Sequence, residues 1–350
     1  MKILFIISSL GSGGAERVLS NLANRMSQAH DITIATFSNN RPFYALSEDV
    51  THIKLDLLQP SSSALQSLKN NAKRLNVLMQ TMKDIDADVN ISFMTQTNLL
   101  AIVASRLRTR KIIVAERIAY DFQKSRLIVL LRRILYPFSN YVITQTVEDS
   151  RHYNFVKKLS VIYNPVLIGK TALKKECIVL AVGRLDPQKG FDLLIDTFAR
   201  IESTGWQLLI AGDGPERESL LRRIEDLKVD NVSLIGNQKD ISSWYAKASI
   251  FVLSSKKEGF PNVLIEAMAS GCAVVSFACP SGPTEIIEHE KNGLLVEDQN
   301  RATLASALER VMYDKTLREK LGSNAIKVRE RYAVEKIVAE WEEIIQEVVG

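Results

Sequence analysis

The sequence predicts an α/β fold made of two doubly wound, Rossmann-like domains. Buried strand-like segments alternate with amphipathic helical segments, and the same pattern starts again after residue 165. A chain of 350 residues is long enough to build two such domains, each with its own core.

In the first half, the alternation is typical of βαβ units and therefore of a parallel sheet. The predicted strands are 2–8, 31–37, 88–93, 111–115 and 141–144, and the clearest predicted helices are 15–29 and 67–85. The first apolar run is too short for a secretory signal, so we interpret it as a buried strand. No run reaches the roughly 18–20 apolar residues that a membrane-spanning helix needs.

The second half repeats this organisation. Its predicted strands are 178–182, 207–211, 232–235, 250–253 and 273–276. We therefore expect domains at 1–165 and 166–332, with Asn164-Pro165 as a hinge because the residue before a proline favours an extended backbone. The amphipathic segment 333–350, which contains Trp341, is predicted to be a helix that packs back onto the first domain.

Charge and cysteine content narrow the class of protein. Residues 1–165 contain 21 Lys and Arg against 12 Asp and Glu, whereas the remainder contains 24 against 28. A basic half suits an anionic bilayer, a pyrophosphate-bearing acceptor or nucleic acid, although solvated surface charge explains it equally well. The three cysteines are too few and too irregularly spaced for a disulfide framework or a metal cluster, which predicts a reducing cytosol.

A glycine-rich loop follows the first predicted strand. Gly11-Ser12-Gly13-Gly14 precedes the helix that begins near Ala15, the position where open α/β sheets bind ligands. The spacing does not match G-x-G-x-x-G, so a dinucleotide oxidoreductase is disfavoured. A simple tight turn stays open as the alternative.

Two cations flank a turn at the start of the second half. Arg184 and Lys189 lie in the segment 183–190, between a predicted strand and a helix, where they suit a diphosphate that gains negative charge as a bond breaks. A surface loop with scattered charges is the alternative. The following loop, 211–215, is interpreted as a structural turn.

The segment 254–271 is the most specific part of the chain. Pro261 suits the first turn of a helix and Gly271 a helix end, so a helix is predicted at 261–270 with the amides of Asn262 and Val263 directed at phosphate. Glu258 then lies before the helix, near a sugar ring, and Glu266 lies inside it, near a ribose diol. Solvent-facing caps are the alternative for both glutamates.

These motifs together resemble the family-4 retaining glycosyltransferases of GT-B fold. The resemblance covers essentially the whole chain and is carried by 183–190, 211–214, 258–266, Gly13-Gly14-Ala15-Glu16-Arg17 and Asn292-Gly293-Leu294-Leu295-Val296. Within the family the chain is similar to bacterial enzymes that extend lipid-linked oligosaccharides, including N-acetylgalactosamine transferases.

The resemblance implies a cleft between two facing domains and a role for each matching residue. Catalysis is expected from Glu258, Arg184 and Lys189, and donor binding from Gly13, Gly14, Arg184, Lys189, Glu258, Asn262, Val263 and Glu266. It further implies retention at the anomeric carbon by front-face attack, a nucleotide-sugar co-substrate that is preferably UDP-linked, and neither metal nor cofactor. The tripeptide Asp86-Ala87-Asp88 looks like a metal-binding motif but precedes a strand in the first domain, far in sequence from the phosphate residues.

The acceptor side is expected in the first domain. Acceptor contacts are predicted for Glu16, Arg117, Lys69 and Lys73, although many family members carry His where this chain has Arg117, so no proton-relay role follows. The segments 67–83 and 124–138 combine apolar side chains with cations at helical spacing, as in a helix on an anionic bilayer or one packed on a sheet. Their cations are Lys69, Lys73, Arg74, Lys83, Lys124, Arg126, Arg132 and Arg133.

The predicted function is therefore transfer of a hexose or N-acetylhexosamine to a glycan, preferably one linked to polyprenyl pyrophosphate, at the inner face of the cytoplasmic membrane. No nucleic-acid partner is predicted. A nucleotide-sugar epimerase of the same architecture needs general bases near the sugar, and none of the histidines, His30, His52, His152 and His289, lies in a site-like motif. A non-catalytic nucleotide-sugar sensor is the remaining alternative.

Overall fold

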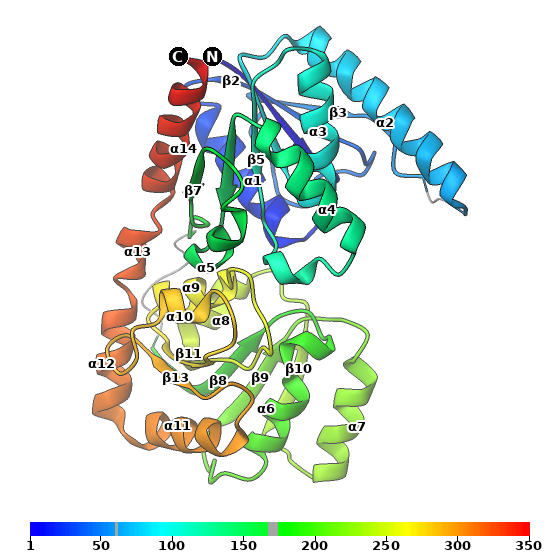
Figure 1. Cartoon of the computed structure of the whole chain (residues 1–350). Helices are drawn as coiled ribbons and strands as arrows, with labels where there is room; N and C mark the ends of the chain where they lie inside the picture. Colours follow the sequence, from blue (N-terminus) through cyan, green and yellow to red (C-terminus); the bar gives the residue numbers. More distant parts are fainter. Residues whose placement is uncertain (60–61, 167–173) are drawn as a thin grey trace. The chain divides into compact units, whose positions relative to one another are not determined.

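The computed structural model describes residues 1–59, 62–166 and 174–350, and the chain divides into two compact units (Figure 1). Unit 1 comprises Met1–Pro165 and Val334–Gly350, and unit 2 comprises Val166–Ala333. Residues 167–173, which follow the predicted hinge at Asn164-Pro165, lie outside the described part of the chain. Each unit is built on one parallel sheet, which confirms the prediction of two doubly wound folds.

The sheet of unit 1 has the order β3-β2-β1-β4-β5-β6-β7, with every neighbouring pair parallel. The five predicted strands are all present. Two further strands, β3 and β7, were not predicted because they lie at the sheet edges, where few of their side chains are buried, and because β7 has only three residues. The strands are β1 (Lys2–Ile7), β2 (Asp31–Thr36), β3 (Val50–Lys54), β4 (Val89–Phe93), β5 (Ile112–Ala115), β6 (Tyr141–Thr144) and β7 (Leu159–Val161).

Helices cover both faces of this sheet, and alternate residues of β1 point to opposite faces. Ile3, Phe5 and Ile7 pack in one core with α1 (Gly14–Met26) and α14 (Val334–Val349). Leu4 and Ile6 pack in the other with α2 (Ala64–Ile85) and α3 (Thr95–Leu107). The remaining elements of the unit are η1 (Tyr120–Phe122), α4 (Arg126–Leu135), η2 (Tyr136–Phe138), α5 (Val147–Ser150) and η3 (Arg151–Tyr153).

The C-terminal helix α14 is part of the core of unit 1. Trp341 is fully buried there and stacks on Phe93 with 5.8 Å between ring centroids. The last residues of the chain therefore complete a core that the first residues begin.

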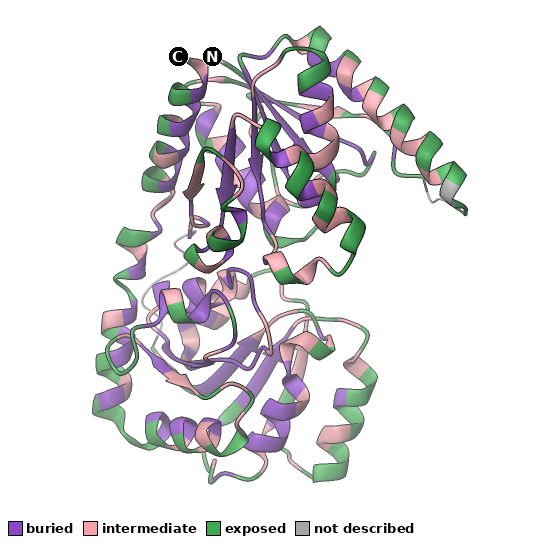
Figure 2. Cartoon of the chain, in the orientation of Figure 1, coloured by how far each residue is buried: buried purple, intermediate pink, exposed green. Residues whose placement is uncertain are grey.

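The sheet of unit 2 has the order β10-β9-β8-β11-β12-β13, again all parallel. The five predicted strands are present, and the short edge strand β13 was not predicted. The strands are β8 (Glu176–Val182), β9 (Gln207–Ala211), β10 (Val232–Gly236), β11 (Ala248–Leu253), β12 (Ala273–Phe277) and β13 (Leu294–Val296). Figure 2 shows that the strands of this sheet are largely buried.

The helices of unit 2 also lie on both faces of its sheet. The core on one face includes side chains of α6, α7, α11 and α12, whereas α8 and α9 contact β8, β11 and β12. The helices are η4 (Pro187–Lys189), α6 (Phe191–Phe198), α7 (Arg217–Leu227), α8 (Ile241–Lys247), α9 (Asn262–Ala269), α10 (Pro283–Ile286), α11 (Arg301–Tyr313), α12 (Lys315–Ala325) and α13 (Val328–Arg331).

Among the residues that the structure describes, no helix has both the length and the apolar character needed to cross a bilayer.

Candidate functional site

Two loops of unit 2 meet at the carboxyl edge of its sheet. Because β8 and β11 are parallel neighbours, the loops that follow them leave the sheet side by side. Three hydrogen bonds join the loops: Ser254 Oγ donates to Lys189 O (2.9 Å), Lys256 N to Gln188 O (2.8 Å), and Gln188 Nε2 to Lys257 O (2.9 Å). The segments 183–190 and 254–271, which were singled out separately from the sequence, are thus hydrogen-bonded to each other.

Lys189 and Glu258 form an ion pair between these loops. Lys189 Nζ lies 2.6 Å from Glu258 Oε1, and Ser255 Oγ donates to the same oxygen at 2.6 Å. The two side chains are only 17% and 8% exposed. Since a buried carboxylate needs such partners, the pair holds both charges in fixed positions. Ser255 is a participant that sequence reasoning did not identify, although it lies in the segment that was singled out.

Arg184, the other predicted cation, lies on the first of these loops and is more exposed to solvent than Lys189. Its side chain is 72% exposed, and its Nε lies 3.8 Å from Asp186 Oδ2. An exposed pair of this kind is screened by water and contributes little, so the guanidinium can reorient at low cost.

Helix α9 begins directly after the second loop, close to the predicted start. Pro261 precedes it, and Asn262 and Val263 are its first residues, whose amides have no acceptor within the helix. Its first turn reads Asn-Val-Leu-Ile, without a carboxylate to neutralise the positive end of the helix dipole. Glu266 lies one turn further along and, like Asn262, is half-buried.

Glycines permit the close approach of backbone segments around this site. Gly190 has φ +63°, and a Cβ there would overlap Ser254 O. Gly212 has φ +144°, and a Cβ there would overlap Gly183 O, which gives the 211–215 loop a structural reason for its glycines. A Cβ on Gly282 would lie 2.5 Å from Pro261 Cδ, so the turn after β12 packs on the start of α9. Sequence reasoning missed this turn, although its Ser-Gly-Pro sequence after a strand was a signal.

Cys279 lies close enough to this site to respond to its charge. Burial raises the pKa of the Cys279 thiol to about 12, and the negative charges of Glu258 and Asp298 act in the same direction. The thiol is therefore protonated at neutral pH and is a poor nucleophile.

In unit 1, the glycine-rich loop leads into α1 as predicted. The amino end of α1 is covered by the carboxylate of Glu16, a residue of the same helix. Gly13 caps α1, Gly14 is its first residue, and a Cβ on Gly13 would overlap the Glu16 carboxylate. Glu16 therefore lies over the amino end of its own helix, at the place where the sequence predicted an anion. The two lysines predicted to contact the acceptor, Lys69 and Lys73, are exposed on α2.

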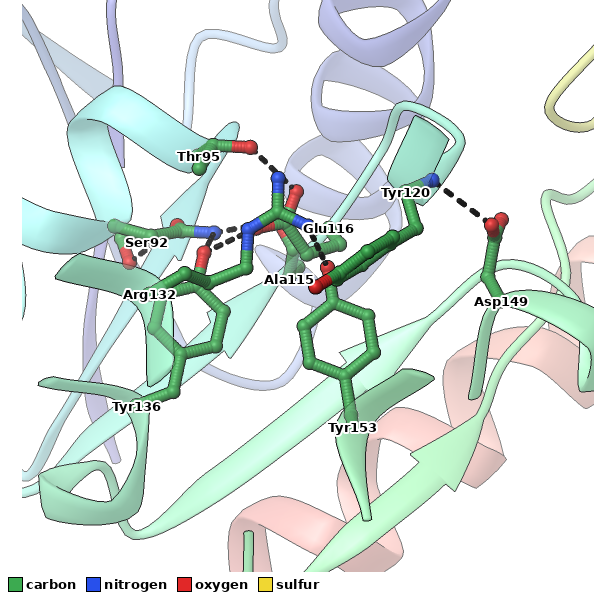
Figure 3. A network of polar contacts seen from close by, with 10 residues as sticks. Ser92, Thr95, Ala115, Glu116, Tyr120, Arg132, Tyr136, Asp149 and Tyr153 are labelled. Atoms are coloured by element: carbon green, nitrogen blue, oxygen red, sulfur yellow. Dashed lines mark hydrogen bonds and ion pairs between the residues drawn. The ribbon is translucent and has the colours of Figure 1, made fainter. Parts of the chain in front are cut away.

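A buried polar network connects α4 to the end of β5 (Figure 3). Glu116 accepts hydrogen bonds from Tyr136 and from Thr95 Oγ1 (2.8 Å), and its Oε1 lies 3.8 Å from Arg132 Nε. Arg132 also donates to Tyr153 OH at 2.9 Å. Burial raises the pKa of the Glu116 carboxyl, and the Arg132 charge partly offsets this.

The expectation that Arg132 contributes to a basic surface is therefore wrong. Its side chain is 0% exposed and points inward to Glu116, whereas its neighbour Arg133 is exposed. Helical spacing could not separate the two because an inward-facing arginine is recognised only through its buried partner.

Arg117 is likewise part of the interior of unit 1. Its Nη1 donates to Ile162 O (3.2 Å) and Asn164 Oδ1 (3.1 Å), and its guanidinium lies 5.3 Å from the ring centroids of Phe93 and Trp341. Burial lowers its pKa to about 9, which the Glu116 charge opposes. With 6% exposure, Arg117 holds the last residues before the unit boundary, and its predicted acceptor contact gains no support from these interactions.

Both aspartates of the Asp86-Ala87-Asp88 tripeptide make contacts within unit 1. Asp86 forms an ion pair with Arg110, and Asp88 Oδ2 accepts a hydrogen bond from Lys2 N at 2.8 Å. Within the described ranges, no group of three or more His, Cys, Asp or Glu side chains is arranged to hold a metal ion.

Comparison with known proteins identifies the class to which these features belong. Residues 167–328 match the family described as Glycosyl transferases group 1. The chain is 30% identical over 99% of its length to a Campylobacter jejuni enzyme named GalNAc-alpha-(1->4)-GalNAc-alpha-(1->3)-diNAcBac-PP-undecaprenol alpha-1,4-N-acetyl-D-galactosaminyltransferase, of which it covers 99%. The chain therefore belongs to the group 1 glycosyltransferases.

A second relative agrees with this assignment, and a solved structure shares the fold. A second Campylobacter jejuni enzyme, N-acetylgalactosamine-N,N'-diacetylbacillosaminyl-diphospho-undecaprenol 4-alpha-N-acetylgalactosaminyltransferase, is 30% identical over 91% of this chain and 92% of its own. The crystal structure of Anabaena Alr3699/HepE in complex with UDP superposes with a TM-score of 0.82, at 22% identity and with 99% and 100% of the two chains covered. The family assignment favours a transferase over the epimerase and sensor alternatives.

Proposed function

We propose that this glycosyltransferase retains the anomeric configuration and moves a hexose or N-acetylhexosamine from a UDP-sugar to a polyprenyl-pyrophosphate-linked glycan, with no metal. The observation that carries the proposal is the Lys189–Glu258 ion pair beside the start of α9. It brings a cation, a carboxylate and the first amides of a helix together at the edge of one sheet, where a sugar diphosphate needs all three.

In the proposed reaction, the bond between the anomeric carbon and the diphosphate oxygen breaks, and UDP leaves with an added negative charge. The acceptor hydroxyl oxygen bonds to the anomeric carbon on the same face, and its proton passes to the departing phosphate oxygen. Lys189, Arg184 and the first amides of α9 bind this growing charge more strongly in the transition state than in the ground state.

Each predicted donor contact is part of the same proposal. Glu258 holds the transferred sugar through its hydroxyls, and Glu266, on the half-buried side of α9, holds the ribose. Lys189 is shared between Glu258 and the diphosphate once the donor binds. Donor binding is also proposed for Gly13 and Gly14 in the loop before α1, and an acceptor contact for Glu16.

The proposed classes of donor and acceptor are based on the names of the relatives. Both Campylobacter enzymes carry names that specify N-acetylgalactosamine transfer to a glycan on diphospho-undecaprenol. The Anabaena protein was crystallised with UDP, and another of its structures contains UDP and glucose. These names support a UDP-sugar and a lipid-linked acceptor here.

A lipid-linked acceptor requires access to a membrane, and we place that contact on α2 and α4. The beginning of α2 exposes Leu65 and Leu68 beside Lys69 and Lys73. Helix α4 and the residues after it expose an apolar stripe at helical spacing, flanked by Arg126 and Arg133; it consists of Leu127, Leu130, Ile134 and Phe138. Exposed apolar side chains with nearby cations suit the anionic, cytoplasmic face of a bilayer.

The transfer reaction is tested with UDP-GalNAc, UDP-GlcNAc, UDP-Gal and UDP-Glc, each with a diphospho-polyprenyl glycan. We expect acceptor-dependent release of UDP with at least one donor and an α-linked product by NMR. Glu258→Ala should reduce turnover at least about 10²-fold, whereas Glu288→Ala, which removes an exposed carboxylate of the same unit, should not. A β-linked product, or equal rates for both variants, would reject the proposed chemistry.

Membrane contact is tested by co-sedimentation with vesicles that contain phosphatidylglycerol. Lys69→Glu/Lys73→Glu should weaken binding by at least about tenfold at low salt, since each surface cation contributes about 1 kcal/mol. Lys320→Glu/Lys327→Glu makes the same change of charge in unit 2 and should have little effect. Equal binding by both variants would place the contact elsewhere.

A further inference from the structure

A cavity of about 630 Å³ lies in unit 2 at the amino-terminal edge of its sheet. Its walls include Cys177 near the start of β8, Ser249 near the start of β11, and Gly271 after α9. The proposed donor residues follow the opposite ends of the same strands. With a rise of about 3.3 Å per residue, the length of β8 separates the two places by roughly 20 Å, so the cavity is distinct from the donor site.

Positive charge dominates the lining of this cavity. All its lining residues belong to the described part of the chain, and among them only Glu319 is acidic. The cationic lining residues are Lys174, Lys175, Lys315, Arg318 and Arg329. Cations gathered in a concave site repel one another and raise the local potential, which favours an anionic ligand.

Three of these cations are held in place by backbone carbonyls. Lys175 Nζ donates to the carbonyls of Tyr245 (3.0 Å), Ala248 (2.9 Å) and Ser270 (2.9 Å). Arg329 Nε donates to Ala269 O at 2.7 Å, and Arg318 Nη1 donates to Val311 O and Met312 O at 2.7 and 2.8 Å. Their charges are therefore positioned before any ligand arrives, which reduces the entropy lost on binding.

Donors remain on several of these side chains. A guanidinium has five N–H groups, and the bonds just described use one nitrogen each of Arg318 and Arg329. Lys174 is exposed, and Lys315 has a long, exposed ion pair with Glu319 at 3.7 Å, which contributes little. Capping of α9 by Lys175 and Arg329, and of α11 by Arg318, explains three of the cations, but it leaves Lys174 and Lys315 without that role.

We propose that this cavity binds a small phosphate-bearing ligand, such as pyrophosphate or a sugar phosphate. Arginine forks and flexible lysines are the groups that proteins use for phosphate oxygens. The volume is within the usual range of small-molecule sites, and Ala246 and Ile326 supply apolar wall for a carbon skeleton. The ligand would be additional to the nucleotide sugar of the proposed reaction.

Cys177 provides a readout that is specific for this cavity. It lines the cavity and is exposed, whereas Cys272 and Cys279 are buried. Iodoacetamide should therefore modify Cys177 first, as followed by mass spectrometry of the intact chain. Pyrophosphate at about ten times its Kd should slow this alkylation about tenfold, because roughly nine-tenths of the cavities would then be occupied.

Two variants separate this site from the donor site. Lys174→Ala/Lys315→Ala should weaken pyrophosphate protection by at least about tenfold, since two charged hydrogen-bond donors are lost. Lys320→Ala/Lys327→Ala is the matched control from outside the cavity, and Arg184→Ala/Lys189→Ala removes the donor-site cations. Both of these should leave the protection of Cys177 intact, whether or not transferase activity survives.

The source of the phosphate is decided by parallel samples. Protection by pyrophosphate or glucose 6-phosphate, lost in Lys174→Ala/Lys315→Ala with its circular dichroism unchanged, supports the proposal. Protection only by phosphatidylglycerol vesicles would overturn it in favour of a lipid contact. The proposal would also be overturned if no soluble phosphate protects Cys177. Full protection of Cys177 in Lys174→Ala/Lys315→Ala would overturn it as well.

Discussion

Each unit carries an ion pair near the carboxyl ends of its strands, and the surroundings of the two pairs differ. Glu116 and Arg132 of unit 1 are 2% and 0% exposed and are enclosed by Tyr136 and Tyr153. Glu258 and Lys189 of unit 2 are more accessible, at 8% and 17%, and lie beside the half-buried start of α9.

The difference separates a structural pair from a functional one. In a fully enclosed pair the loss of either partner destabilises the fold, because it leaves a charge without compensation in the interior. A pair at the edge of an open helix terminus can exchange one partner for a ligand at lower cost. Substitutions in the two ion pairs are therefore expected to differ in effect: mainly on stability for Glu116–Arg132, and mainly on activity for Glu258–Lys189.

Arg132→Met should destabilise unit 1 by about 3–5 kcal/mol, because the Glu116 carboxylate stays buried without its cation. Urea unfolding followed by circular dichroism measures this change. Arg126→Met, which removes an exposed arginine of the same helix, should change stability by less than about 0.5 kcal/mol. Equal stability of the two variants would show that the buried pair has no structural role.

Lys189→Ala should lower turnover at least about 10²-fold, because the growing charge of the leaving diphosphate loses a direct partner, and should cost less stability than Arg132→Met because Glu258 is less deeply buried than Glu116. Steady-state release of UDP measures the effect. Lys256→Ala removes a half-buried lysine of the adjoining loop, paired with Asp192 at 3.7 Å, and should retain most of the activity. A wild-type rate for Lys189→Ala would assign the ion pair to structure alone.

Gly190→Ala should destabilise unit 2 by about 1–3 kcal/mol, because the residue has a left-handed backbone and a Cβ would overlap Ser254 O. Gly205→Ala is a matched control, with φ +79° but open space around the added Cβ. Thermal unfolding of both variants separates the two contributions. If both variants have the same melting temperature, the close approach of the two loops does not restrict the side chain at position 190.

Ser255→Ala should have a smaller effect, a drop in turnover of about tenfold, because Glu258 loses one of two partners on the same oxygen. Ser255→Thr keeps the hydroxyl and should recover part of the rate. If Ser255→Ala lowers stability without changing turnover, the hydroxyl supports the loop rather than the position of Glu258.

Local patterns in the sequence were sufficient for most of the fold. The start of α9 was predicted within one residue because proline and glycine mark its two ends. The edge strands β3, β7 and β13 were missed because their side chains are only partly buried, and β7 and β13 have only three residues each. Such strands depend on pairing with a neighbour, which no local pattern reports.

The candidate site was predictable as a set of residue types but not as a set of contacts. Sequence order suggested that Lys189 and Glu258 serve one ligand, and the structure places them in contact. The same reasoning wrongly placed Arg132 on a surface, because long-range partners decide which arginines turn inward. The acceptor contact of Arg117, which is buried beside Asn164, stays a prediction.

The affinity of unit 2 for UDP is the decisive quantity, and isothermal titration calorimetry of the full chain measures it. With Arg184 and Lys189 on the diphosphate, Arg184→Ala/Lys189→Ala should weaken UDP binding at least about 10²-fold, while Lys256→Ala binds nearly as wild type does. Unchanged affinity in Arg184→Ala/Lys189→Ala would contradict a diphosphate site at the start of α9.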